Sequence, residues 1–158
     1  MIQPAFVPVI FYRDPLAALK WLEAAFGFET TSLVTDAEGR VGHSQMEFRG
    51  GAVSIGGEWE GREIGDARMR SPASLGGIGT QFVRVYMSEG LDAHCEQARA
   101  AGARILAEPE DQFYGARVYR ARDPEGHVWN FSQEVRAVPD NEIEQSSGVK
   151  IRNSLKEV

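Results

Sequence analysis

A pattern that occurs twice constrains the fold of this chain most. Two helical segments each end at a glycine, Gly27 and Gly102, and these glycines lie 75 residues apart. Glycine is common at helix ends because it adopts the left-handed conformation without strain. Around each glycine the same order recurs, with one apolar strand before the helix and three strands after it. The sequence of 158 residues therefore predicts two copies of a strand–helix–three-strand module.

In the first copy, Asp14 is suited to cap a helix and Pro15 to occupy its first turn. Apolar residues then recur at helical spacing as far as Phe26. The predicted strands of this copy span residues 6–12, 28–35, 41–48 and 52–56. In the second copy we expect a helix over 91–101 and strands over 81–87, 104–107, 117–122 and 127–133.

The domain organisation follows from this repeat. One helix on one short sheet leaves the other face of the sheet open, so two copies are needed to enclose a cavity. We expect a first module over 1–57, a connector over 58–77, a second module over 78–135 and a tail over 136–158. Trp59 in the connector is a candidate lid residue or dimer contact. The tail, with few large apolar residues, is expected to be partly disordered or to pack on a second subunit.

Composition indicates which partners, cellular location and cysteine chemistry to expect. The net charge of −6 argues against nucleic acid as a partner and mildly favours neutral or cationic ligands. The sequence shows neither an apolar membrane span nor a secretory signal, so we expect a cytoplasmic protein without membrane contact. The single cysteine, Cys95, lies in a helical pattern among alanines and is interpreted as a small buried residue rather than a nucleophile.

The turn Asp123-Pro124-Glu125-Gly126 leads directly into an apolar strand, and the two helices end in Ala-Ala-Phe-Gly and Ala-Ala-Gly sequences. Together these features resemble the vicinal-oxygen-chelate superfamily of glyoxalases, bleomycin-resistance proteins and extradiol dioxygenases, over roughly residues 4 to 134. The resemblance implies an α+β fold in which two βαβββ modules pair their curled mixed sheets around a cup, with helices on the outer face. It also implies a small-molecule ligand and a homodimer.

Metal enzymes of that superfamily place one metal ligand on the first and one on the fourth strand of each module. The corresponding positions in this chain are occupied by Val7, Ser54, Phe82 (or Gln81 with a shifted register) and Asn130. None of these side chains is an imidazole, carboxylate or thiolate, the groups that bind first-row divalent metals. The three histidines, His43, His94 and His127, fall in different elements. We therefore expect no metal site and no cofactor, and interpret His94 and His127 as surface or hydrogen-bonded residues.

Strand alternation predicts a pocket wall, because every second side chain shares a face. Trp129 and Phe131 alternate with Asn130 and are expected in the core. The second module contributes Arg117 and Tyr119, whose common face the sequence leaves undecided. The expected ligand-binding residues are Val7, Val9, Phe11, His43, Gln45, Glu47, Ser54, Phe82, Arg84, Tyr86, Arg117, Tyr119 and Asn130.

Three functions remain open at this point. The leading interpretation is a metal-independent binding protein, similar to bleomycin-resistance proteins, that sequesters a cationic or aromatic compound. The alternative is a lyase, isomerase or dioxygenase-type enzyme of the superfamily, with His43 and Glu47 as the candidate acid–base residues. Side chains at positions i and i+4 of a strand lie roughly 13 Å apart, so these two would act at opposite ends of a substrate. A third interpretation is a protein-interaction module built from the connector and the tail.

Overall fold

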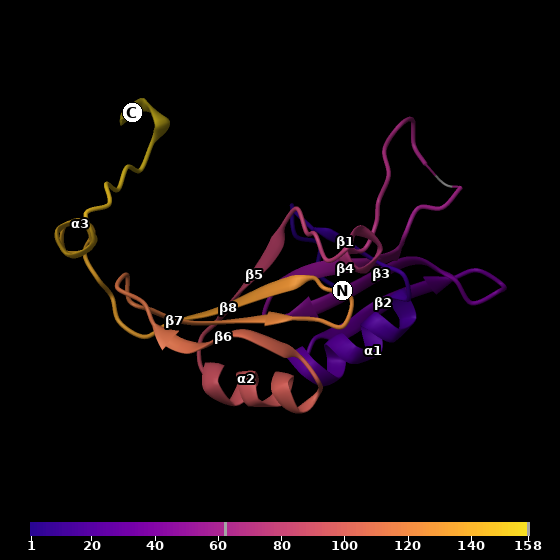
Figure 1. Cartoon of the computed structure of the whole chain (residues 1–158), viewed down its shortest axis with the longest axis horizontal. Coiled ribbons are helices and arrows are strands. Elements are labelled where there is room, and N and C mark those ends of the chain that lie inside the picture. Colours follow the sequence, from indigo (N-terminus) through magenta and orange to yellow (C-terminus); the bar gives the residue numbers. More distant parts are fainter. Residues whose placement is uncertain (62, 158) are drawn as a thin grey trace.

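Each half of the chain forms a four-stranded mixed sheet with one helix lying across it (Figure 1). The computed structural model describes residues 1–61 and 63–157. The first module contains β1 (Val9–Tyr12), α1 (Pro15–Phe26), β2 (Glu29–Thr35), β3 (Val41–Phe48) and β4 (Gly51–Gly57). The second contains β5 (Phe82–Met87), α2 (Leu91–Ala100), β6 (Arg104–Asp111), β7 (Ala116–Arg122) and β8 (Val128–Glu134).

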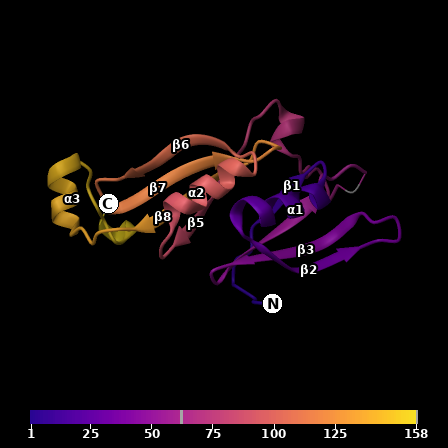
Figure 2. The same cartoon turned by 90° about the horizontal axis from the view of Figure 1, so that it is seen from below.

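The two sheets share one topology. Their strand orders are β1-β4-β3-β2 and β5-β8-β7-β6, with β1 parallel to β4 and β5 parallel to β8. Even the register matches, since Val9 pairs with Ser54 and Arg84 pairs with Asn130, each 75 or 76 residues further along. Both helices lie on the same side of the sheets (Figure 2). The α+β fold of two βαβββ modules expected from the sequence is thus confirmed.

Helix α1 begins and ends as its sequence predicts. The side chain of Asp14 accepts a hydrogen bond from the Ala17 backbone N–H at 2.9 Å, and Gly27 ends the helix with φ of 66°. The apolar face of the helix is buried against the sheet and against α2; it comprises Ala18, Leu19, Leu22, Ala25 and Phe26. In α2, Cys95 is fully buried, as expected, and burial raises the pKa of its thiol to about 11.

Polar contacts join the two modules beneath the sheets. The His94 ring on α2 lies 2.9 Å from the Phe26 carbonyl and 2.6 Å from the Tyr119 hydroxyl. Because a carbonyl only accepts, Nε2 of His94 carries the proton and Nδ1 accepts from the tyrosine. Trp21 donates to the Ala101 carbonyl at 2.8 Å. The interpretation of His94 as a hydrogen-bonded residue is confirmed, and the modules are linked within one chain.

A second link uses the turn that carried the family resemblance. Asp123 is 4% exposed, and its Oδ2 accepts hydrogen bonds from the Tyr12 hydroxyl at 2.5 Å and from Trp129 Nε1 at 3.1 Å. Its Oδ1 accepts the backbone N–H groups of Glu125 and His127 at 3.1 and 3.0 Å. The turn therefore shapes its own hairpin and also holds β1 of the first module. His127 Nε2 in turn lies 2.8 Å from the Phe11 carbonyl.

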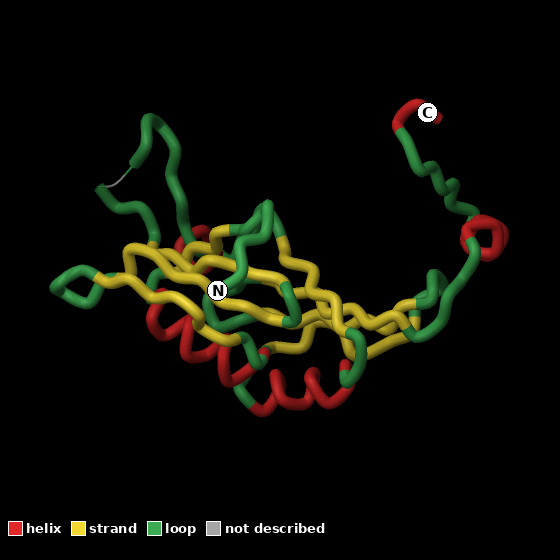
Figure 3. The backbone as a smooth tube through the Cα atoms, turned by 180° about the vertical axis from the view of Figure 1, so that it is seen from behind, coloured by secondary structure: helices red, strands yellow, loops and turns green. Residues whose placement is uncertain are grey.

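Several boundaries differ from the sequence prediction. Strand β1 begins at Val9 rather than at residue 6, and β6 continues to Asp111 through Pro109. Proline is tolerated there because β6 is an edge strand, whose outward N–H groups need no partner. The connector includes a short 3-10 helix, η1 (Pro72–Leu75), and projects from the body (Figure 3). No helix in the described part of the chain is long and apolar enough to cross a membrane.

The tail forms the helix α3 (Asp140–Ser147) and the short 3-10 helix η2 (Leu155–Glu157). Helix α3 buries none of its residues and leads away from the two sheets (Figure 1). The segment that leads into the tail is held on the second module by the Gly115 carbonyl, which accepts hydrogen bonds from the N–H groups of Val135 and Arg136 at 3.0 and 3.1 Å.

Candidate functional site

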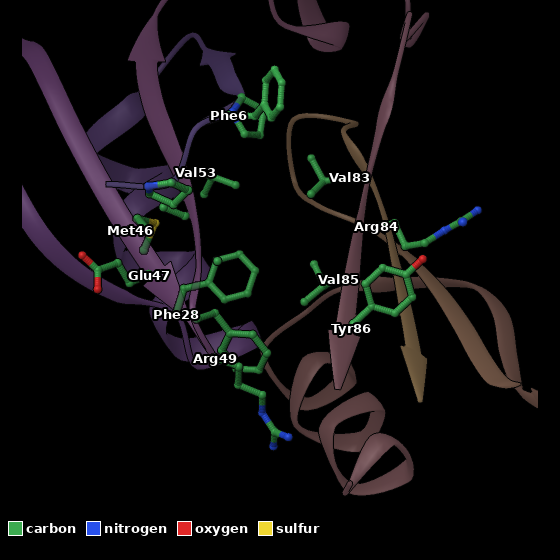
Figure 4. Close-up of a pocket in the computed structure, with 16 residues that line it drawn as sticks. Phe6, Phe28, Met46, Glu47, Arg49, Val53, Val83, Arg84, Val85 and Tyr86 are labelled. Atoms are coloured by element: carbon green, nitrogen blue, oxygen red, sulfur yellow. The ribbon is translucent and has the colours of Figure 1, made fainter. Parts of the chain in front are cut away.

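The side of each sheet opposite the helices is open, and alternation along the strands decides which side chains it displays. On β5, Phe82 is 52% and Tyr86 69% exposed, whereas Val83 and Val85 pack against the core. Figure 4 shows the two valines pointing toward Phe28 while Arg84 and Tyr86 point to the other side of the strand. On β8, Trp129 and Phe131 are fully buried under the helices, as predicted for core residues.

A hollow of about 670 Å³ lies on the open face of the second sheet. Asn130 and Ser132 of β8 form part of its floor and are only 3% and 6% exposed. Tyr114, from the loop before β7, lines the same hollow and is 45% exposed. The Arg84 guanidinium interacts with the Tyr86 hydroxyl, and this contact raises the pKa of Arg84. The structure therefore brings the predicted residues Arg84, Tyr86 and Asn130 together.

The first sheet carries a separate group of predicted residues. Val9 pairs with Ser54, Phe11 is the next outward residue on β1, and Val7 is half-buried just before the strand. Val9 and Phe11 line a second hollow, of about 660 Å³, together with residues of the connector. The ring of Trp59, expected to be a lid residue or a dimer contact, meets Phe11 edge-on at 5.7 Å between ring centroids.

His43, Gln45 and Glu47 lie at alternate positions of β3, and the carboxylate of Glu47 is engaged by hydrogen bonds. Glu47 accepts hydrogen bonds from the Ile2 backbone N–H at 2.8 Å, from Thr31 at 2.9 Å and from Gln45 at 3.0 Å. The bond from Ile2 and the two side-chain donors lower the pKa of Glu47 against the opposing effect of desolvation. A carboxylate with a lowered pKa is a weaker base, and this one holds the N-terminal segment. His43 is exposed.

Arg117 and Tyr119 share a face, but it is the helix-covered face. Tyr119 is fully buried and stacks on Phe131 at 4.9 Å between centroids. Arg117 pairs with Asp92 of α2 at 2.7 Å and with Asp111 of β6 at 2.8 Å. Both side chains therefore lie on the opposite side of the sheet from Arg84 and Asn130, and neither lines the hollow.

A third space, an apolar cleft of about 380 Å³, separates the two modules (Figure 4). Phe6, Phe28 and Val53 line it from the first module, and Val83 and Val85 line it from β5. Its walls are largely apolar extensions of the core, and the charged residues that line it are Glu47, Arg49 and Arg84. Binding sites usually combine apolar walls with polar groups that orient a ligand, which the hollow on the second sheet offers.

The residues at the metal positions of the superfamily do not fit a metal. Ser54 and Asn130 are neutral, and the residues directly opposite them across the parallel strand pairs are Val9 and Arg84. A valine has no lone pair to donate, and a guanidinium repels a divalent cation. In the described residues, 1–61 and 63–157, no three His, Cys, Asp or Glu side chains gather closely enough to hold a metal ion.

The model of the Glyoxalase/Bleomycin resistance protein/Dioxygenase superfamily matches residues 5–131. The chain belongs to this superfamily. An uncharacterized protein of Mycobacterium bovis, Mb0911c, is 28% identical over 144 residues, which cover 90% of this chain and 91% of that protein. A protein of Mycobacterium tuberculosis, Rv0887c, is also 28% identical over 144 residues and is likewise described only as uncharacterized.

Solved structures agree with this assignment. TioX from Micromonospora sp. ML1 superposes with a TM-score of 0.65 at 29% identity, covering 84% of this chain and all of that one. The fosfomycin resistance protein FosX from Listeria monocytogenes, solved with Mn(II) and sulfate, has a TM-score of 0.57 at 14% identity over 92% of this chain and 98% of its own. At that identity the second likeness shows the fold alone.

Proposed function

We propose that this member of the superfamily binds a small aromatic compound, without a metal, in the hollow on the second sheet. The observation that carries the proposal is the pair Asn130 and Ser132, two almost fully buried polar side chains at the floor of an otherwise open hollow. Tyr86 and Tyr114 supply exposed aromatic surface beside them. A volume of about 670 Å³ lies within the usual range of small-molecule sites.

The test uses 2-naphthamide, an uncharged aromatic probe, and measures its binding by isothermal titration calorimetry and by amide chemical shifts of β8. We expect the Tyr114→Ala variant to bind about tenfold less tightly, because it removes one aromatic contact from the hollow. Phe113→Ala is the matched control. Phe113 is similarly exposed and contacts the Tyr114 ring, yet it does not line the hollow. Equal losses of affinity in both variants, or amide chemical-shift changes confined to the first module, would refute the location of the binding site on the second sheet.

We also propose that two copies associate and cover the open faces. Large apolar side chains are exposed on these faces, Phe82 at 52% and Val9 at 44%, and Phe6, just before β1, is 90% exposed. Exposed apolar side chains of this size are often covered by a partner surface. Helix α3, which buries nothing on its own chain, is the segment we assign to the partner subunit. Light scattering is expected to give a dimer for the full chain and a weaker dimer after deletion of residues 139–158; a monomer at every concentration contradicts the proposal.

A further inference from the structure

Arginine side chains gather on the open face of the second sheet. Asn130 is the strand partner of Arg84 on one side and of Arg120 on the other, so these three residues form one row across β5, β8 and β7. Paired residues on neighbouring strands point to the same face, and strands lie about 4.8 Å apart. The two arginines therefore flank Asn130 from backbone positions roughly 10 Å apart. The next row adds Arg122 and Arg104, which are partners of each other.

These four arginines lack the paired acidic partners that Arg70, Arg99 and Arg117 have. Arg99, Arg117 and Arg70 each contact two carboxylates. By contrast, no ion pair joins Arg84, Arg104, Arg120 or Arg122 to a carboxylate of the described residues. Arg104 and Arg122 stand directly opposite one another, an arrangement that destabilises a sheet.

The positive charge is therefore concentrated around one place in a chain whose net charge is −6. The Nε atom of Arg122 is buried with no hydrogen-bond partner among the described residues. Two carboxylates share the open face, those of Glu110 and Glu134. Both lie further along the strands than the arginine rows, and Glu134 lines the hollow at the end where Arg136 also lines it. An anion placed beside Asn130 would relieve the repulsion among the arginines.

The centre of this cluster also lacks partners. The side chains of Asn130 and Ser132 make no hydrogen bond to any residue in the described parts of the chain, although they are 3% and 6% exposed. The polar atoms of both side chains reach the solvent of the hollow, so a ligand with complementary atoms there can supply the hydrogen bonds that the protein does not. An amide N–H₂, a hydroxyl and a guanidinium are all donors, and what they have in common is affinity for an oxyanion.

We propose that Arg84 and Asn130, which line the hollow, together with Arg120, which is paired with Asn130 on β7, bind an oxyanion group, a carboxylate or a phosphate, on the aromatic ligand of the hollow. This inference rests on the proposed function and names the charge of the ligand. It also replaces the cationic ligand that the net charge favours at first sight. Local charges within a Debye length of about 8 Å outweigh the distant acidic residues at physiological ionic strength.

The experiment compares three probes that share one ring system: 2-naphthoate, 2-naphthyl phosphate and the uncharged 2-naphthamide. At least one anionic probe is expected to bind about ten- to a hundredfold more tightly than the amide, the effect of one or two charge-assisted hydrogen bonds. The stronger of the two anions identifies the group. Arg120→Gln is expected to remove most of that advantage, measured as the ratio of the anion's affinity to that of 2-naphthamide in the same variant, whereas Arg120→Lys retains part of it.

The control is Lys20→Gln, which removes the same charge from the outer surface of α1 and is expected to change nothing. A urea titration establishes that each variant is folded. Tight binding of the amide with no advantage for either anion refutes the anion site and leaves the proposed function standing. An advantage that survives Arg120→Gln, or disappears in Lys20→Gln, also refutes the site. No binding of any probe at millimolar concentration refutes both proposals.

Discussion

The buried carboxylate of Asp123 offers a sharp test of how the modules are held together. Replacing Tyr12 by Phe removes the 2.5 Å hydrogen bond between the modules and preserves the shape of the ring. Asp123 keeps three further donors, so the carboxylate is not left unsatisfied. A hydrogen bond to a charged group contributes about 1.5–3 kcal/mol, and we therefore expect Tyr12→Phe to lower the free energy of unfolding by about 2 kcal/mol.

Asp123→Asn is expected to lower the free energy of unfolding more than Tyr12→Phe does. An asparagine can keep its oxygen toward the backbone N–H groups of Glu125 and His127, but its amide nitrogen then faces Trp129 Nε1, which is itself a donor. A buried donor without an acceptor costs about 1–3 kcal/mol in addition to the weakened bond from Tyr12. The total is about 3–4 kcal/mol, and the double variant is expected to show a coupling energy of about 1–2 kcal/mol.

Urea unfolding followed by Trp fluorescence measures both quantities. The midpoint should fall while the slope of the transition stays constant. Tyr114→Phe is the control, because Tyr114 is 45% exposed and its replacement should stay within about 0.5 kcal/mol of the original. A cost for Tyr12→Phe below about 0.5 kcal/mol, or strictly additive costs in the double variant, would show that the contact does not join the modules.

Three further predictions concern pH, the backbone and metals. Burial lowers the pKa of His94, so the unfolded state binds a proton at this residue more readily than the folded state does. The free energy of unfolding should therefore decrease as pH falls below about 6.5. In His94→Gln, the urea midpoint should fall less between pH 7 and pH 5 than in the original protein. At Gly115, with φ of 90°, a Cβ would lie 2.0 Å from the Arg136 carbonyl oxygen. Gly115→Ala should therefore lower the free energy of unfolding by at least about 2 kcal/mol and release the start of the tail. The release is measured as faster proteolysis after residue 134. Elemental mass spectrometry of untagged, undialysed protein should find no stoichiometric transition metal, and a stoichiometric metal would overturn the assignment of Arg84 to the position opposite Asn130.

The sequence predicted the repeated module because its signals are local. Helix caps such as Asp14, helix-ending glycines and alternating apolar residues act within a few positions, and all of them agree with the fold. The same alternation placed Arg84 and Tyr86 on the open face and Trp129 in the core. Asn130, identified first as an absent metal ligand, turned out to lie in the floor of the hollow.

What the sequence could not predict depends on contacts between distant segments. The facing of β7 is one example, since Arg117 and Tyr119 are directed toward α2 by Asp92 and His94, which are 25 residues away. Arg120 was missed because its importance arises only when β7 pairs with β8 beside Asn130. Tyr114 lies in a loop, where no periodicity exists to assign a face. The sequence makes Glu47 a catalytic candidate because it shares a strand face with His43. Its hydrogen bond from the Ile2 N–H could not be predicted because it spans 45 positions.

The presence of an arginine as the strand partner of Asn130 has a chemical consequence for function. A guanidinium attracts oxyanions through directed hydrogen bonds, but it stays protonated in proteins and neither gives nor takes a proton at neutral pH. Arg84 is held further in that state by its contact with Tyr86, which raises its pKa. Asn130 and Ser132 likewise offer donors without being acids or bases at neutral pH. The open face of the second sheet therefore carries groups suited to bind and orient an anion, and the side chains of its hollow that can transfer a proton are Glu134, Tyr86 and Tyr114.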